Sequence, residues 1–306
     1  MKTKAKTLFT IDSIAQQHEL MGLPKPQHPL MSISQFEESK GVTTKETGQF
    51  INKFYAIAIK RKCTCRTRYG QNDYDYNQGM MSFFAPEQVL SWNADDEMPS
   101  TGWSISIHPD FLRGHALEQK IKEYGFFNYA VNEALHLSPK EEAMLERLLK
   151  IIHDEYHTNI DNFSQDIILS HLSLLLSYAN RFYNRQFITR KHANSDLLTK
   201  LEVLLTEYFN STKIEENGLP TVKYLSEQLN ISPNYLSDLL RNLTGQNTQQ
   251  HIHNKLIEKA KEMLASSNLT VSEIAYYLGF EYSQSFNKLF KSKTSITPLE
   301  FRASFN

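Results

Sequence analysis

A pattern of apolar residues near the C-terminus occurs twice, and this repeat restricts the fold more than any other feature of the chain. In each copy the spacing is that of two short helices joined by a turn. Matching positions lie 49 residues apart in the first helix and, after a slip of one residue, 50 residues apart in the second. The repeat therefore predicts two similar helical units. The matching pairs are Val222 and Val271, Leu225 and Ile274, Leu229 and Leu278, Ile231 and Phe280, Leu236 and Phe286, Leu239 and Leu289, Leu240 and Phe290, and Arg241 and Lys291.

Capping residues mark where the predicted helices begin. Thr270 is an N-cap residue with Glu273 three positions later, which is the capping-box pattern. Ser232 precedes a proline, a combination typical of a helix start. Ser283 is the corresponding N-cap candidate in the second copy, and Thr297–Glu300 forms another capping box that begins a last short helix.

The segment between the two units, Thr248 to Ser266, is predicted to be one longer helix. Such a helix would fix the separation of the units, and recognition helices about 34 Å apart can enter successive major grooves of DNA. The polar face of the second unit suits this role, since it carries amide and basic side chains. An ordinary helical hairpin is the alternative for one copy considered alone, and the repeat favours DNA binding. The inner face of the long helix is Ile252, Leu256, Ala260, Met263 and Leu264.

Motifs in both units resemble the AraC/XylS-type transcriptional regulators over about 100 residues, from Thr199 to Phe305. The first unit contains Leu229-x-Ile-Ser-Pro-Asn-Tyr-Leu-Ser237, which is similar to the N-terminal helix-turn-helix of that family. The second unit and its flanks keep the order and spacing of five further motifs. These are Ala260-x2-Met-Leu264, Val271-x2-Ile-Ala275, Leu278-Gly-Phe280, Phe286-x3-Phe-Lys291 and Thr297-Pro298-x2-Phe-Arg302.

The resemblance implies a DNA-binding domain of seven helices with two recognition helices. It also assigns the side chains that would face double-stranded DNA, with Lys291 as a phosphate contact. On the first recognition helix these are Asn234, Tyr235, Ser237, Asp238 and Arg241; on the second they are Ser283, Gln284, Ser285, Asn287, Lys288 and Lys291.

Three residues depart from the family pattern. Asp238 stands where many members carry a basic residue, Ser285 where an aromatic is usual, and Ser295 where a glycine is usual. Asp238 can accept from cytosine but repels phosphate, and Ser295 would be strained by a left-handed backbone. Residues 199–306 contain 11 basic and 11 acidic residues, so phosphate binding would depend on local lysine clusters at 288–293 and 255–261.

Length and composition fit a soluble chain of about two domains. The 306 residues are 40% hydrophobic and 22% charged, with a net charge of −1. No apolar run approaches the roughly 20 residues that span a bilayer, and the basic N-terminus lacks the apolar core of a secretory signal. The two cysteines, Cys63 and Cys65, are interpreted as reduced thiols, with a redox role as the alternative. We therefore expect a cytoplasmic protein with no membrane partner.

Short strands are predicted between residues 28 and 108, at 54–59, 80–84, 88–92 and 103–108, with a hairpin from Tyr74 to Phe84. This run is compatible with the cupin-like barrel that many regulators of the resembled family carry. The predicted fold class is α+β: a small N-terminal β-barrel with a helical pair, followed by an all-α domain with two helix-turn-helix units. No His lies between His28 and His108, so no metal site is expected in the strands.

The strand-rich region is predicted to bind a small-molecule effector, because it contains many aromatic side chains and no catalytic constellation. The effector-binding residues themselves remain unknown from the sequence. The candidate walls are Phe54, Tyr55, Tyr74, Tyr76, Phe83, Phe84, Trp92 and Trp103.

Two amphipathic helices are predicted to follow, the first opened by a capping box at 138–141 and the second running from about Phe163 to Phe187. Their broad apolar faces favour a homodimer through residues 138–187, with packing against the barrel as the alternative. His153 and His157 have a zinc-compatible spacing but no third ligand, so no metal is expected. The predicted domains are a sensor and dimerisation domain, 1–188, a polar linker, 189–198, and the DNA-binding domain, 199–306.

Taken together, these patterns predict a sequence-specific DNA-binding transcription regulator that responds to an effector through its N-terminal domain. RNA polymerase is a further candidate partner, and no cofactor is expected. An enzyme whose helical domain only mediates interaction is the first alternative, but the sequence lacks a Gly-rich phosphate loop, a nucleophile elbow and a metal cluster. A DNA-repair fusion is the second alternative, and it would need a reactive Cys63 or Cys65.

Overall fold

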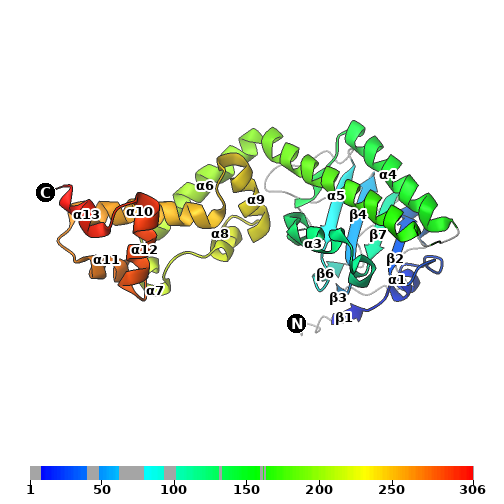
Figure 1. The fold of residues 1–306 in the computed structure, drawn as a ribbon, viewed down its shortest axis with the longest axis horizontal. Coiled ribbons are helices and arrows are strands. Elements are labelled where there is room, and N and C mark those ends of the chain that lie inside the picture. Colours follow the sequence, from blue (N-terminus) through cyan, green and yellow to red (C-terminus); the bar gives the residue numbers. More distant parts are fainter. Residues whose placement is uncertain are drawn as a thin grey trace, which may run out of the picture. The chain divides into compact units, whose positions relative to one another are not determined.

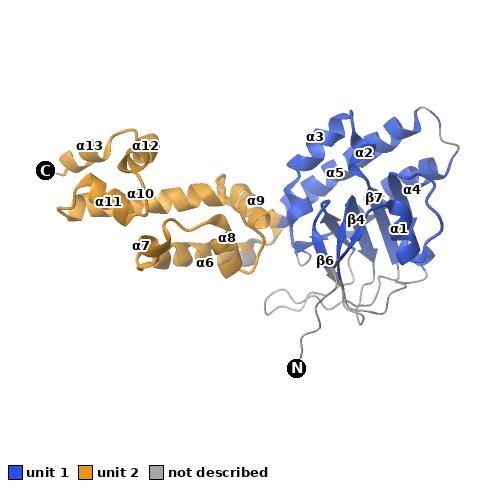
Figure 2. Cartoon of the chain, turned by 90° about the horizontal axis from the view of Figure 1, so that it is seen from below, with its two compact units in different colours: residues 1–186 blue, residues 187–306 orange. Residues whose placement is uncertain are grey.

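The computed structural model describes residues 8–39, 48–61, 79–92, 101–130, 133–158, 161 and 163–305. It divides into two compact units, residues 1–186 and 187–306 (Figure 2). Unit 1 contains β1 (Leu8–Ile11), α1 (Ile14–Leu20), β2 (Met31–Gln35), η1 (Phe36–Glu38), β3 (Gly48–Asn52), β4 (Tyr55–Arg61), β5 (Met80–Phe84), β6 (Val89–Trp92), β7 (Thr101–Ile107), α2 (Pro109–Leu112), α3 (Ala116–Glu123), η2 (Gly125–Asn128), β8 (Leu135–His136), α4 (Pro139–His157) and most of α5 (Ser164–Thr189).

The strands of unit 1 form two sheets. The larger sheet has the order β2-β7-β4-β5-β8 and is antiparallel throughout, whereas the smaller has the order β1-β3-β6 with β1 parallel to β3. The central strands β4 and β7 are buried on both faces, since each has three consecutive buried residues. Ile57 on β4 and Ile105 on β7 lie opposite each other in the ladder and are both about 1% exposed.

The prediction of a mixed α+β chain with a helical C-terminal part is confirmed, but the prediction of a closed barrel is wrong. Among the described residues, β2 and β8 are the edges of the larger sheet and each pairs with one neighbour. An alternating sequence pattern indicates a half-buried strand, but closure requires hydrogen bonding between two edges, which such a pattern does not encode. The likeness to a cupin stays a prediction.

Part of the sequence prediction for this region lies outside the described residues. These residues are Cys63, Cys65, Tyr74 and Tyr76, so the thiols and the first arm of the predicted hairpin are not tested. The second arm of that hairpin is β5, which pairs with β4.

Helix α4 begins with the predicted capping box, in which Ser138 accepts from the Glu141 amide and Glu141 accepts from the Ser138 amide. His157 contacts the carbonyl of His153 on its own helix. Within the described ranges, no group of three His, Cys, Asp or Glu side chains could hold a metal ion. Among the helices in the described ranges, none combines the length and the apolar composition of a membrane span.

Helix α5 crosses a face of the larger sheet (Figure 1) and is attached to unit 1 along its second half. The Tyr183 ring stacks on Phe126 of η2 with centroids 5.5 Å apart, and its hydroxyl donates to the Glu133 carbonyl. Arg185 donates to Glu141 of α4 and to the His136 carbonyl. Much of the apolar face of α5 is therefore covered by its own unit.

Unit 2 is entirely helical. Helix α6 starts at Lys191, so most of the predicted linker, 189–198, is helical in the structure. The described part of the unit has eight helices from α6 onward rather than seven, because the single-turn α7 lies between α6 and the first repeat. The elements are α6 (Lys191–Phe209), α7 (Lys213–Asn217), α8 (Val222–Gln228), α9 (Pro233–Thr244), α10 (Thr248–Ser266), α11 (Val271–Tyr277), α12 (Ser283–Thr294) and α13 (Pro298–Ala303).

Candidate nucleic-acid interface

The first helix-turn-helix is α8 followed by α9, joined by a turn in which Asn230 adopts a left-handed backbone (φ +55°). The turn ends where the Ser232 hydroxyl accepts from the Tyr235 amide, which confirms the predicted N-cap. Leu225 on α8 and Leu236 on α9 are fully buried, and the two helices pack against each other. The apolar spacing read from the sequence therefore forms the support on which α9 is held.

The second helix-turn-helix, α11 followed by α12, repeats this plan. The predicted capping box of Thr270 and Glu273 is present, and the Thr270 amide and hydroxyl both donate to the Glu273 carboxylate. These donors hold the pKa of Glu273 below its usual value, because they stabilise the charged form. One predicted cap is wrong: Ser283 is the first helical residue of α12, and Tyr282 takes the cap position without a side-chain bond.

The long helix α10 joins the two units, and Figure 1 shows α9 and α12 toward its opposite ends. The lysines of α10 are engaged within unit 2. Lys255 pairs with Glu258 at 3.4 Å, and Lys259 lies 3.1 Å from Glu262 and donates to Asn210. The Lys261 ammonium lies 5.7 Å from the centre of the Phe301 ring. The cluster at 255–261 therefore offers less free charge for phosphates than its sequence indicates.

On α9, Asn234 and Arg241 are exposed, and Arg241 donates to Asp238 one turn earlier at 2.8 Å. The hydroxyl of Ser237 shares a hydrogen bond of 3.0 Å with buried Thr248 at the start of α10.

The expected exposure of Tyr235 is wrong, since its side chain is only 3% exposed and its ring packs edge-on against Phe187. The sequence places Tyr235 next to the buried Leu236, but the contact with Phe187 is distant in the chain and has no local signal.

The outer face of α12 presents a broader set of polar groups. Gln284, Ser285, Asn287, Lys288 and Lys291 are all exposed, whereas Ser283 is partly buried. Within the part of the chain that the structure describes, the amides of Gln284 and Asn287 have no hydrogen-bond partner. Lys288 and Lys291 form no salt bridge there, although the charge of Lys291 contributes to lowering the pKa of Glu300. The opposite face is anchored in a column of rings: the centroids of Phe280 and Phe286 are 5.5 Å apart, those of Phe286 and Phe290 5.7 Å, and those of Phe290 and Phe301 5.6 Å.

Two exposed aromatic residues near α12 were not singled out by the sequence reasoning. Tyr282, which caps α12, is 67% exposed, and Tyr276 on α11 is 58% exposed. A signal for Tyr276 exists in the sequence, because it lies off the stripe formed by Val271, Ile274 and Leu278.

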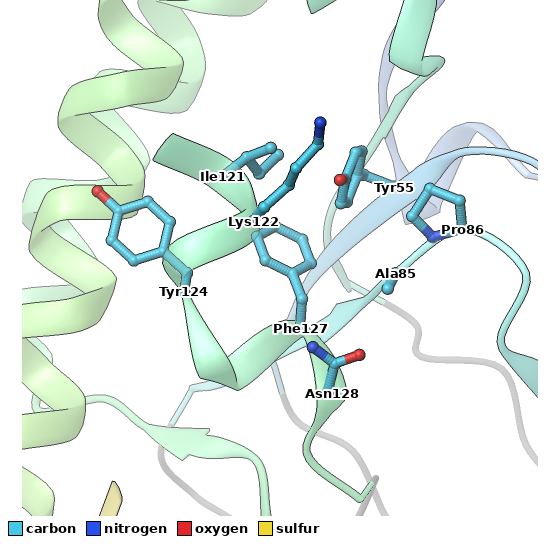
Figure 3. A pocket seen from close by; sticks show the side chains of 8 residues that line it. All are labelled: Tyr55, Ala85, Pro86, Ile121, Lys122, Tyr124, Phe127 and Asn128. Carbon is cyan, nitrogen blue, oxygen red and sulfur yellow. The ribbon is translucent and has the colours of Figure 1, made fainter. Parts of the chain in front are cut away.

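A separate pocket of about 310 Å³ lies in unit 1, between β4, the residues after β5, α3 and η2 (Figure 3). Of the eight aromatic residues proposed as effector walls, Tyr55 lines it. Phe54, Phe83 and Trp103 are buried in the core, Phe84 is partly buried, and the Trp92 side chain, Tyr74 and Tyr76 lie outside the described residues. The pocket is lined by Tyr55, Ala85, Pro86, Ile121, Lys122, Tyr124, Phe127 and Asn128.

Comparison with known proteins agrees with the helical plan of unit 2. A family model described as a helix-turn-helix domain matches residues 225–304, which extend from α8 to the end of α13. Residues 225–304 therefore carry an AraC-type helix-turn-helix domain.

Curated relatives of this domain include regulators from several bacteria. The regulator YfiF of Bacillus subtilis is 30% identical over 48% of this chain and 43% of its own. The raffinose operon regulatory protein RafR of Pediococcus pentosaceus is 32% identical over 35% of this chain and 40% of its own. The chain thus spans less than half the length of these relatives. By name, both relatives are regulators of transcription rather than enzymes.

Among solved structures, the C-terminal domain of the response regulator yesN of Fusobacterium nucleatum is 30% identical. The match covers 35% of this chain and 98% of that chain, with a TM-score of 0.31.

Proposed function

We propose that the chain is a transcription regulator that binds specific sequences of double-stranded DNA, with α12 as the main base-reading helix. The observation that carries this proposal is the outer face of α12, where the exposed amides of Gln284 and Asn287, which have no partner among the described residues, lie on a rigid aromatic support. Gln and Asn can bond bidentately to adenine in the major groove, and lysines one turn away can bind phosphates. Such a protein would act in the cytoplasm, where bacterial DNA lies.

The proposed interface extends to the first unit, where α9 has the smaller role. Its exposed polar residues are fewer, and the charge of Arg241 is already shared with Asp238. Tyr235 is left out because it is buried. The interface consists of Asn234, Ser237, Asp238 and Arg241 on α9 and of Ser283, Gln284, Ser285, Asn287, Lys288 and Lys291 on α12.

The full chain tests this proposal directly. Its affinity for duplexes selected from a random library should exceed its affinity for random duplexes by about 10³-fold or more at physiological salt. Equal affinities for selected and unselected duplexes would contradict a sequence-specific regulator.

We also propose that the chain forms a homodimer through the outer face of α5. Ile167 and Leu174 are 39% and 43% exposed and lie seven residues apart, so they share one side of the helix. Leu172 and Leu175 are not part of this face, because both are fully buried in unit 1. From the sequence, the whole Leu-rich stripe was interpreted as one surface. In the structure, some of its residues lie in the core of unit 1 and others are exposed to solvent.

The dimer proposal has a matched pair of variants. Ile167→Asp combined with Leu174→Asp should give a folded monomer, because both positions are exposed. Leu172→Asp should instead unfold unit 1, since it places a charge in the core. Light scattering of the wild-type chain at micromolar concentration checks the premise, and a monomer there would exclude this interface.

We further propose that a small-molecule effector binds unit 1 and regulates DNA binding by the chain. The pocket beside Tyr55 supports it, because its volume of about 310 Å³ lies at the lower end of the range typical of small-molecule sites.

A further inference from the structure

The walls of the pocket in unit 1 are largely apolar, and its polar groups lie in two places: Tyr55 and Lys122 at one end, and Asn128 away from them (Figure 3). Ile121, Phe127 and Pro86 supply apolar surface, and Phe127 packs edge-on against the Tyr55 ring with centroids 5.1 Å apart. In Figure 3 the Lys122 ammonium and the Tyr55 hydroxyl point to the same end of the pocket. A ligand that fills this pocket would therefore match it with an apolar body and a polar group at the end that carries Lys122 and Tyr55.

The two groups at that end are both available to a ligand. No hydrogen bond or ion pair engages the Tyr55 hydroxyl or the Lys122 ammonium within the described residues. Burial raises the pKa of Tyr55, so its phenol stays protonated at neutral pH and can donate a hydrogen bond. A phenol donor beside an ammonium favours an acceptor that carries negative charge.

The acidic residues near this end do not satisfy Lys122. Glu87 follows Pro86 in the chain but pairs with Lys53 at 3.1 Å. Glu123 is adjacent to Lys122 on α3, and successive residues of a helix do not face each other. Glu118 lies one turn before Lys122 on α3 and accepts from the Gly114 amide. Within the described residues, none of these three carboxylates forms an ion pair with Lys122.

We propose that this pocket binds a small organic carboxylate, with the carboxylate between Lys122 and Tyr55 and the apolar body against Phe127 and Ile121. A ligand with one negative charge fits the neutral rings and the single ammonium better than a phosphate or a polyol does. A phosphate or a polyol would leave several of its polar groups unpaired against apolar walls. Asn128 lines the pocket as well and offers an amide to a substituent on the ligand.

The pocket also connects to the helix that leaves unit 1. Tyr124 lines the pocket, and its hydroxyl lies 3.5 Å from the Ser177 hydroxyl on α5. The Tyr124 ring stacks on Phe126 with centroids 5.0 Å apart, and Phe126 in turn stacks on Tyr183 of α5. A carboxylate that orders Tyr124 and Phe127 would thus act on α5, whose last residues belong to unit 2. This consequence rests on the proposed function, whereas the binding site does not.

The binding experiment uses calorimetry on the full chain with phenylacetate and hexanoate, and with phenylacetamide and hexanamide as uncharged counterparts. At least one carboxylate should bind saturably, and its amide should bind about tenfold or more weakly because the charge-assisted bonds are lost. Lys122→Met should weaken carboxylate binding about tenfold or more, and Tyr55→Phe several-fold. Lys120→Met is the matched control, since Lys120 is an exposed lysine of the same helix outside the pocket, and it should bind as the wild type does.

Two results would overturn the carboxylate site. One is that neither carboxylate binds at millimolar concentration, and the other is that the Lys122→Met and Tyr55→Phe variants bind as tightly as the wild type.

The consequence for DNA is measured separately, by titrating selected duplex with and without the bound carboxylate. Coupling must be reciprocal, so DNA should change carboxylate affinity by the same factor. Binding without any such change would exclude the route through α5. A chain that fails to discriminate DNA in the absence of ligand would instead contradict the proposed function and leave the calorimetric result intact.

Discussion

In the first helix-turn-helix unit, the exposed guanidinium of Arg241 on α9 is bonded to Asp238, and Ser237 is bonded to buried Thr248. In the second unit, the corresponding helix α12 presents Lys288 and Lys291 without an ion-pair partner within the described residues, beside two unpaired amides. The same backbone plan thus carries two different surfaces. A duplicated fold does not imply a duplicated function, because the outward-facing residues of the two copies differ while their cores correspond.

The turns of the two units also differ, because the first contains Asn230 with φ +55° and the second contains Gly279 with φ +81°. The turn of the second unit gives the largest expected effect on stability. Gly279 has φ +81°, and a Cβ added there would lie 2.7 Å from Gly218 Cα. Gly279→Ala should therefore lower the free energy of unfolding of unit 2 by about 2–4 kcal/mol, from backbone strain and overpacking together. Hydrogen exchange of α11 and α12 in the full chain measures this loss.

The control for Gly279 is Gly245→Ala, where φ is +76° but nothing lies within 4 Å of the added Cβ. Strain alone should cost about 1 kcal/mol at that position. Equal losses for the two variants would show that the close approach to Gly218 is not a constraint.

The exposed lysines of α12 give the next largest effect, which is on DNA affinity and its salt dependence. Lys288→Ala combined with Lys291→Ala should weaken binding to all duplexes alike and reduce the slope of log affinity against log salt by about 0.9 for each lost phosphate contact. Lys259→Ala is the matched control, because Lys259 is already bonded to Glu262 and Asn210. A loss at position 259 as large as the loss at 288 and 291 would place α10, rather than α12, against the phosphates.

A smaller effect on DNA affinity is expected from the ion pair between Asp238 and Arg241 on α9. Asp238→Asn removes a negative charge and releases Arg241, so non-specific affinity should rise and the salt slope should steepen by at most about 0.9, the value of one phosphate contact. Filter binding at several salt concentrations detects this change. An unchanged slope would mean that Arg241 stays away from DNA even when it is released.

The smallest effect concerns the helix ends after α9 and α12. Gly245 and Ser295 occupy matching positions, and both adopt a left-handed backbone, with φ +76° and +68°. Ser295→Gly should stabilise unit 2 by about 0.5–1 kcal/mol, since relief of strain exceeds the added entropy of the unfolded chain. Hydrogen exchange of α12 provides the measurement, and a loss of stability would show that Ser295 is not strained.

The sequence predicted those parts of the interface whose causes are local. The caps at Ser232, Thr270 and Thr297 follow from short side-chain-to-backbone bonds, and the structure has all three. The strain at Ser295 was predicted from its place in the repeat and from the family pattern at that position. These features depend on neighbouring residues or on the second copy, both of which are visible in one sequence.

The parts that the sequence could not predict depend on distant contacts. The burial of Tyr235 results from its packing against Phe187, which is distant in the sequence. Which leucines of α5 are buried and which are exposed depends on the side of the helix that packs against the rest of unit 1. The pocket could not be placed because five of its eight lining residues lie on α3, on η2 or between them, beyond the strand-rich region where a site was expected. These are Ile121, Lys122, Tyr124, Phe127 and Asn128.

The central claim is that α12 reads bases more than α9 does, and selection of duplexes from a random library by three full-length proteins tests it most directly. Wild type is compared with Gln284→Ala combined with Asn287→Ala, and with the matched α9 variant Asn234→Ala combined with Arg241→Ala. The α12 variant should lose about 1–3 kcal/mol of discrimination at each base whose bidentate contact is removed. The α9 variant should keep most of the wild-type preference. A relaxed consensus in the α9 variant, with an unchanged one in the α12 variant, would contradict the account.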